Sequence, residues 1–201
     1  MLFSGLAQDI NKFEKFQDRL KKGNSTLGFN INLMQYIESA DFVEFNISPS
    51  IEYSYFLVNR FSLNTSFRFY QQFYSNLGSK ERNLRSEKSI NIWLRYYFFK
   101  RGGFFVGLGG SFGHVVVDYD NELAKKFYVV PTAEIGYSYM ISNMWKPINN
   151  KVSVNFAVGT YIPVKKYSKF DQCDQFLPYF PFFHVEVGVT YYFMKKPKEN
   201  K

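Results

Sequence analysis

Side chains alternate with a period of two along most of this chain, and the alternation limits what the chain can fold into. Between residues 61 and 69 the odd positions hold mostly aromatic or aliphatic residues, and the even positions hold Ser62, Asn64, Ser66 and Arg68. The same contrast recurs about eight times between residues 24 and 193. Successive side chains of a β-strand point to opposite faces, so a period of two is typical of strands. The pattern predicts an all-β protein.

The chemistry of the two faces is unlike that of a soluble β-protein. The polar positions hold mostly Ser, Asn, Gly and Thr, whereas a strand face in contact with water normally carries Lys, Glu and Asp. The apolar positions draw on 24 Phe and 16 Tyr in a chain of 201 residues. Small polar side chains suit a narrow barrel interior, and a large apolar face suits contact with lipid. No run of about 18 apolar residues exists, so the sequence excludes a transmembrane helix.

Eight candidate strands follow from the alternation: 25–36, 41–56, 61–74, 88–99, 104–117, 126–141, 151–164 and 183–193. After the first connection, short turns alternate with longer polar loops at 75–87, 118–125 and 165–182. Short turns at one end and long loops at the other are typical of outer-membrane barrels, with the short turns in the periplasm. We therefore expect a closed up-and-down antiparallel eight-stranded transmembrane β-barrel, with periplasmic termini and those three loops outside.

The two ends of the sequence differ from the barrel region at 24–193. Residues 1–8 resemble the end of a secretory signal peptide, because small residues at Gly5 and Ala7 follow a few apolar residues. Residues 9–23 form a lead-in in which apolar residues recur at spacings of three and four. This spacing indicates a short amphipathic helix that lies on the membrane surface or plugs one end of the barrel, and the alternative is a lead-in without fixed structure. Residues 194–201 form a basic tail.

Aromatic residues gather near the ends of the predicted strands, as interfacial girdles of a membrane barrel do. They are Phe42, Tyr55, Phe61, Phe73, Phe98, Phe104, Phe127, Tyr139, Tyr191 and Phe193. Two residues oppose the assignment, because Pro49 and Pro131 fall inside predicted strands and proline cannot donate to a strand ladder. We expect local bulges at these prolines, or strand portions that rise above the membrane.

The charges well inside the predicted strands all occupy the small polar positions. They are Glu44, Glu52, Arg68, Arg95, Glu134 and Glu186, and His184 lies on the same face as Glu186. An eight-stranded barrel is just wide enough for its side chains to fill it, and buried charges need partners. We expect Arg68 and Arg95 to bind some of the four glutamates in a polar network that fills the lumen. A conducting pore or proton path through these groups is the alternative.

With strand count, phase and loop alternation in view, the chain resembles the small eight-stranded outer-membrane barrels of the OmpA and OmpX type and the short barrel proteins of the Bacteroidetes. The resemblance covers residues 25–193 and includes the closing strand Val185-Glu-Val-Gly-Val-Thr-Tyr-Tyr-Phe193. It implies that this aromatic-terminated strand is the signal read by the barrel insertion machinery. Residues 194–201 continue beyond that aromatic end, which departs from the family pattern.

The resemblance also raises an enzymatic alternative, because some eight-stranded barrels modify lipid A with a His, Ser and Glu set. Ser111 and His114 differ by three positions, so a regular strand places them on opposite faces. His184 and Glu186 share a face, but the sequence assigns no Ser to them. A second alternative is a soluble lipocalin-like carrier of a small apolar ligand, which predicts a far more charged exterior. The sequence indicates no catalytic residues, no cofactor and no metal site, since its one cysteine, Cys173, has no histidine nearby.

The sequence therefore favours an outer-membrane protein of a Gram-negative bacterium with a structural or surface-interaction role rather than an enzyme. We expect any partner to bind loops 75–87, 118–125 and 165–182. Lys165, Lys166 and Lys169 are the residues expected to contact lipopolysaccharide or an anionic partner. The other expected partners are outer-membrane lipids and the insertion machinery. No nucleic-acid motif accompanies the net charge of +8, and a monomer is expected.

Overall fold

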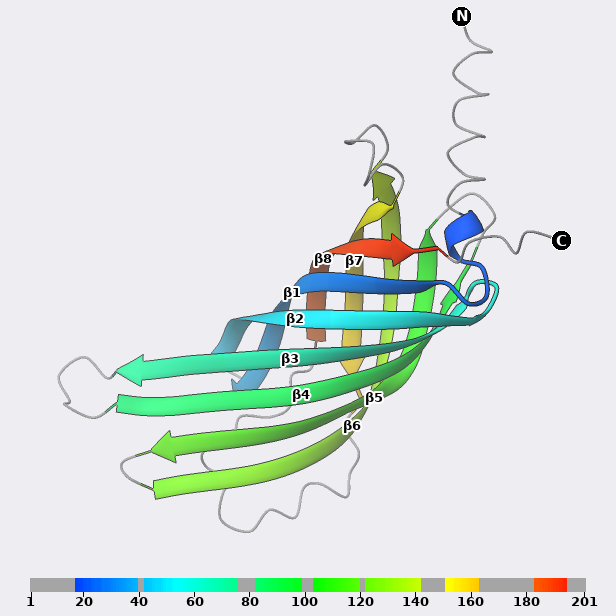
Figure 1. Ribbon diagram of the computed structural model, residues 1–201. Coiled ribbons are helices and arrows are strands. Elements are labelled where there is room, and N and C mark those ends of the chain that lie inside the picture. Colours follow the sequence, from blue (N-terminus) through cyan, green and yellow to red (C-terminus); the bar gives the residue numbers. More distant parts are fainter. Residues whose placement is uncertain are drawn as a thin grey trace, which may run out of the picture.

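The computed structural model describes residues 17–39, 42–75, 82–98, 103–119, 122–141, 151–162 and 183–194. Eight strands form a closed antiparallel barrel in chain order (Figure 1). They are β1 (Ser25–Ser39), β2 (Phe42–Val58), β3 (Phe61–Ser75), β4 (Arg82–Tyr97), β5 (Phe104–Tyr119), β6 (Glu122–Ile141), β7 (Val152–Tyr161) and β8 (Phe183–Phe193). Strand β8 pairs with β1 and closes the barrel. In the described part of the chain, no helix is long and apolar enough to cross a membrane.

The strands are staggered around the barrel. Starting at Phe67 in β3, the pairing reaches Val129 of β6 through β4 and β5. In the other direction, through β2, β1, β8 and β7, it reaches Tyr139 of β6, ten residues away. Such a stagger requires the strands to tilt by about 35–45° from the barrel axis. All eight strands are therefore oblique.

The alternation predicted from the sequence sorts the side chains as expected. Phe67, Leu94 and Phe156 point outward and are about half exposed, whereas Asn64, Arg95 and Asn155 are buried inside. The apolar face is thus the outer face, and the interior holds the polar residues. A soluble barrel would bury the apolar set instead.

The structure corrects two of the three predicted loops. Strand β4 begins at Arg82 and β5 extends to Tyr119 with β6 starting at Glu122, so most of 75–87 and of 118–125 is strand. Backbone hydrogen bonds join these hairpins whatever their side chains, and a polar sequence there signals contact with water rather than a loop. The third loop, 165–182, lies outside the described residues, as do residues 1–8, most of the lead-in 9–23 and the tail after Met194.

At each of the two prolines, the strand stops pairing with one of its two neighbours. Strand β2 pairs with β1 as far as Phe42, but its pairing with β3 ends at Ser50 opposite Arg68, next to Pro49. Strand β6 pairs with β5 as far as Glu122, but its pairing with β7 ends at Thr132, next to Pro131. No register shift occurs at either proline, so the expected bulges are absent from these described strands.

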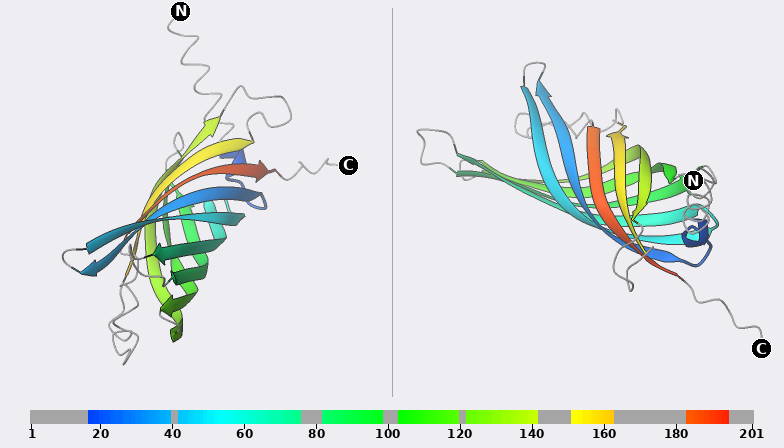
Figure 2. Two further views of the ribbon diagram at one scale, coloured as in Figure 1. Left: turned by 90° about the vertical axis from the view of Figure 1, so that its left-hand side faces the viewer. Right: turned by 90° about the horizontal axis from the view of Figure 1, so that it is seen from above.

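Proline has no backbone N–H, which explains why the β2–β3 and β6–β7 pairings end at these positions. The Phe56 amide donates toward β1, and residues along a strand alternate between neighbours, so Pro49 faces β3. Its place as donor to the Phe69 carbonyl is taken by the Ser48 hydroxyl at 2.9 Å. Beyond these points the β1–β2 hairpin diverges from the sheet β3–β6 (Figure 2). The end of the barrel where β1 turns into β2, β3 into β4 and β5 into β6 is therefore split, and we call it the split end. The opposite end holds the start of β1 and the end of β8 and is called the closed end.

Candidate functional site

Six of the seven charged or histidine residues assigned to the lumen are buried inside the barrel. Strands β2, β3, β4, β6 and β8 supply Glu52, Arg68, Arg95, Glu134, His184 and Glu186. Glu44 lies in β2 opposite Tyr36, but its side chain is outside the described part of the structure. The polar phase of the sequence thus brings titratable side chains from five strands into one enclosed space.

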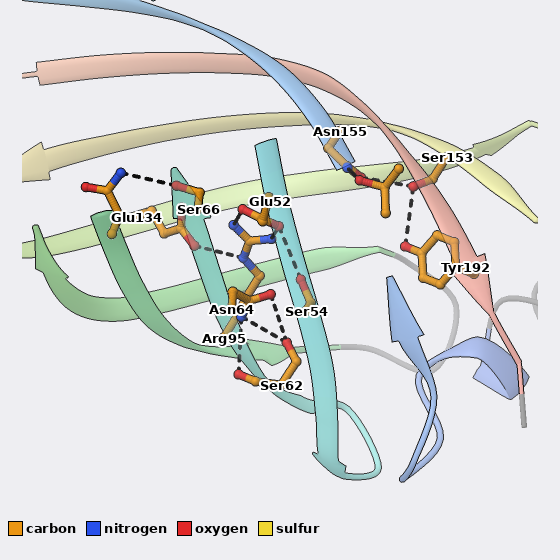
Figure 3. Close-up of polar contacts among 12 residues, drawn as sticks. Glu52, Ser54, Ser62, Asn64, Ser66, Arg95, Glu134, Ser153, Asn155 and Tyr192 are labelled. Carbon is orange, nitrogen blue, oxygen red and sulfur yellow. Dashed lines mark hydrogen bonds and ion pairs between the residues drawn. The ribbon is translucent and has the colours of Figure 1, made fainter. Parts of the chain in front are cut away.

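Arg95 joins two carboxylates from different parts of the barrel wall (Figure 3). Its Nε atom donates to Oε1 of Glu134 at 2.8 Å. Its Nη1 and Nη2 atoms donate to the two carboxylate oxygens of Glu52 at 2.9 and 3.2 Å. A fork of this kind uses the planar guanidinium to hold a carboxylate in a fixed orientation. The three side chains form a bridge across the interior from β4 to β2 and β6.

Gly107 leaves room for this bridge, and Phe105 and Ser54 contact it. Gly107 of β5 lies opposite Glu134, and a Cβ atom at Gly107 would collide with the Oε1 atom of that glutamate. The guanidinium of Arg95 lies 4.3 Å from the centroid of the Phe105 ring, and Ser54 donates to Oε1 of Glu52 at 3.3 Å. Both carboxylates thus have hydrogen-bond donors, which a buried charge requires.

Arg68 belongs to a second polar layer nearer the split end. It donates to Oδ1 of Asn91 at 3.0 Å and to the Tyr161 hydroxyl. Farther along, the Tyr128 hydroxyl donates to Glu87 at 2.5 Å. Neither Tyr161 nor Tyr128 was predicted to join the lumen network, although both fall on the inward phase of their strands. That phase was the available signal, and tyrosine was overlooked because it resembles the outward residues.

His184 and Glu186 also lie in the interior. The ring of His184 packs against Tyr161 with a centroid separation of 5.4 Å. Within the described residues, the Nδ1 atom of His184 has no hydrogen-bond partner. Ser111 is buried inside β5, and His114 lies on its outer side beside Phe127. The described structure therefore shows no histidine oriented by a second group toward a serine, which nucleophilic catalysis would need.

An apolar cluster fills the closed end of the barrel. It consists of Leu20, Phe56, Tyr97, Phe105, Ala157 and Tyr192. Leu20 comes from the short turn before β1, whose backbone is held by the β2–β3 turn: Arg60 donates its N–H to the Leu20 carbonyl at 2.7 Å, and Gly23 donates to Phe56 at 2.9 Å. Leu20, near the end of the lead-in, thus reaches into this end of the barrel.

Arg19 is buried beside this apolar cluster. Burial lowers the pKa of its guanidinium from the ordinary value, and the nearby Tyr192 and Asp18 oppose that shift. The aromatic residues of the cluster are on the inward phase in the sequence, and Leu20 belongs to the apolar stripe of the lead-in, but nothing in the pattern indicated that Arg19 would be buried beside them. The interior is therefore closed by apolar packing at one end and crossed by the Arg95 bridge farther along.

Two other kinds of site are a metal site and the predicted contact at the surface lysines. Among the residues that the structure describes, no group of three His, Cys, Asp or Glu side chains is placed to hold a metal ion. The surface lysines Lys165, Lys166 and Lys169 lie outside those residues, so their role stays a prediction.

Comparison with known proteins identifies the fold. No family model matches the chain, and no curated protein matches it. The N-terminal β-barrel domain of Pseudomonas aeruginosa OprF is 11% identical, with a TM-score of 0.55, and the match covers 86% of this chain and 100% of that one. Neisserial surface protein A is 12% identical, with a TM-score of 0.56 and coverage of 87% and 100%. Ail, the attachment invasion locus protein of Yersinia pestis, is 12% identical, with a TM-score of 0.53 and coverage of 86% and 99%.

At these identities the likeness shows the fold alone. The chain has the closed eight-stranded antiparallel architecture of small outer-membrane barrels, and the recognition made from its sequence is confirmed at that level.

Proposed function

We propose that this protein is an integral outer-membrane barrel with a structural or surface-interaction role. The observation that carries the proposal is the distribution of side chains between the outer and inner faces of the barrel wall. The outer surface of the strands exposes a belt of large apolar side chains, and the interior is occupied by paired charges and an apolar cluster. A belt of this kind is stable in hydrocarbon and not in water. A filled interior leaves the surface as the place where partners bind.

We further propose that the closed end, with the start of β1 and the end of β8, faces the periplasm. The split end then faces outward, with its hairpins beyond the membrane. The aromatic end of β8 at Tyr191 and Phe193 supports recognition by the insertion machinery, because both rings lie at the closed end where an inserting strand would be read. Lys165, Lys166 and Lys169 remain the proposed loop contacts with lipopolysaccharide or an anionic partner.

Two measurements test the proposal. The protein should fractionate with outer membranes, and its folded form should migrate differently on a gel before and after boiling, because a closed barrel resists unfolding by detergent. Recovery in the soluble fraction without detergent would contradict it and favour the lipocalin-like carrier. Changed lipid A in cells that express the protein, seen by mass spectrometry, would instead favour the lipid A-modifying enzyme.

A separate test concerns the loop lysines. Replacing Lys165, Lys166 and Lys169 together by Glu should weaken binding to purified lipopolysaccharide, because the substitution reverses three charges that would face its phosphates. Unchanged binding would remove this loop from the proposed contact surface.

A further inference from the structure

The outer face of the sheet β3–β6 carries positive charge where its apolar surface ends. Strand pairing places Phe69, Lys88, His114 and Phe127 at neighbouring positions across the four strands. Paired residues share a face of the sheet, and Phe69 and Phe127 are exposed, so all four side chains point away from the interior. The row runs obliquely, because the strands tilt. It forms one aromatic and cationic stripe on the outside of the barrel.

The two nitrogen-bearing side chains of the stripe are each held by a ring. The Nζ atom of Lys88 lies 5.9 Å from the centroid of the Phe69 ring. The ring of His114 lies 4.5 Å from that of Phe127, which is 77% exposed. A lysine whose stem lies along an aromatic ring keeps its ammonium at the edge of the apolar region. Both groups thus lie beside aromatic rings at the edge of the apolar surface.

The rows on either side locate that boundary. One row toward the closed end, the outward residues are Phe67, Ile90, Phe112 and Val129, all apolar and all exposed. One row toward the split end they are Gln71, Ser86, Val116 and Lys125, and Lys125 is exposed. The change from apolar to polar happens within this stripe. It is where hydrocarbon would give way to lipid headgroups.

The opposite boundary has a different composition. Near the closed end, outward aromatic residues pack in pairs, Tyr96 with Phe98 and Phe104 with Tyr137. Ten residues of chain separate Phe98 from Lys88, which at about 3.3 Å per residue and a tilt of about 40° corresponds to about 25 Å along the axis, the height of a membrane barrel's apolar belt. Among the outward-facing strand residues whose side chains the structure describes, Lys88 and Lys125 carry all the lysine and arginine charge. Among those described strand side chains, the cationic ones therefore lie at the boundary nearer the split end, whereas the lysines near the closed end, such as Lys21 and Lys22, lie outside the strands.

We propose that Lys88 and Lys125, with His114 between them, bind phosphate groups of lipid A in the outer leaflet. Phe69 and Phe127 lie beside these groups, where the apolar surface gives way to polar side chains. The site is separate from the loop lysines, and it rests on the outward orientation of the split end proposed above. Charge complementarity selects the ligand, because an ammonium at a headgroup boundary attracts lipid phosphate and gains little from a neutral headgroup.

Native mass spectrometry of the detergent-purified protein tests the proposal, with bisphosphorylated lipid A as the probe. The double variant Lys88→Gln/Lys125→Gln keeps much of the side-chain length and removes both charges. Each lysine near an anionic lipid surface contributes about 1 kcal/mol, so affinity for lipid A should fall about fivefold per lysine. Affinity for dephosphorylated lipid A should be weak for the wild type and the variant alike.

The matched control is Lys21→Gln/Lys22→Gln, which removes two exposed lysines at the closed end and should leave lipid A affinity unchanged. Equal binding by wild type and the Lys88/Lys125 variant would overturn the proposal, as would equal loss in the control. Competition by phosphatidylglycerol as strong as that of lipid A would overturn it in favour of a general anionic surface. A variant that shows heat-modifiable mobility and resides in the outer membrane, yet binds lipid A normally, refutes this site and leaves the proposed function standing.

Discussion

Arg95 holds two carboxylates that lie far apart in sequence, and its removal would leave both in a closed interior. Glu134 and Glu52 accept from it at 2.8 and 2.9 Å, and all three side chains are buried. Forming such a bridge gains little net stability, because desolvation of the charges offsets their attraction. Breaking it is different, since the remaining charges lose their partner. The bridge therefore matters most when one member is missing.

We predict that Arg95→Met destabilises the folded barrel by about 3–5 kcal/mol, because two buried carboxylates lose their cation. The measurement is the urea midpoint of the folded band in lipid vesicles. In the triple variant Arg95→Met/Glu52→Gln/Glu134→Gln the carboxylate charges are gone, so much of the stability should return. Equal losses in the single and triple variants would mean that Arg95 acts through packing on Phe105 rather than through charge.

At the level of the strands, side-chain alternation predicted that all eight exist, which face of each is inside, and that the six described lumen residues share that face. It did not predict how far β4 and β6 extend, because polar hairpins are held by backbone hydrogen bonds that leave no mark on side-chain polarity. Nor did it predict that Arg95 would select Glu52 and Glu134 rather than Glu186. That choice depends on the stagger of the barrel, which brings together residues that are about forty positions apart.

The prolines give a prediction at the same level. In Pro49→Ala, the new amide should donate to the Phe69 carbonyl and replace the Ser48 hydroxyl, so that the β2–β3 ladder gains a hydrogen bond. The gain of about 1 kcal/mol is offset by the greater freedom of the unfolded chain, so hydrogen exchange is a better measure than stability.

The new amide at position 49 should exchange slowly in the folded protein. In Pro131→Ala, the new amide should likewise exchange slowly, because the Pro131 carbonyl already accepts from Ile162 at 2.8 Å and its nitrogen faces the same strand. Rapid exchange at both new amides would show that the split end diverges for a reason other than the missing donors.

Over the described part of the molecule, two barriers lie in series along the interior between the closed end and the Arg68 layer. The first is the apolar cluster at the closed end, where Leu20 packs with Tyr97 and Tyr192. The second is the bridge from Arg95 to Glu52 and Glu134. An ion that passes along the axis would have to displace both, and the first offers few polar atoms to replace its hydration shell. The barrel should therefore be closed to ions unless both barriers are removed.

This arrangement predicts the conductance of three variants in planar bilayers. The wild type should show no steady current. Tyr97→Ala/Tyr192→Ala opens the apolar cluster and should stay silent, because the bridge remains, and Arg95→Ala/Glu52→Ala/Glu134→Ala should stay silent because the cluster remains. The variant that combines all five substitutions should conduct, provided that heat-modifiable mobility shows it to be folded. Steady current in the wild type would mean that the described side chains do not seal the lumen, and current in either partial variant would show that a single barrier closes it.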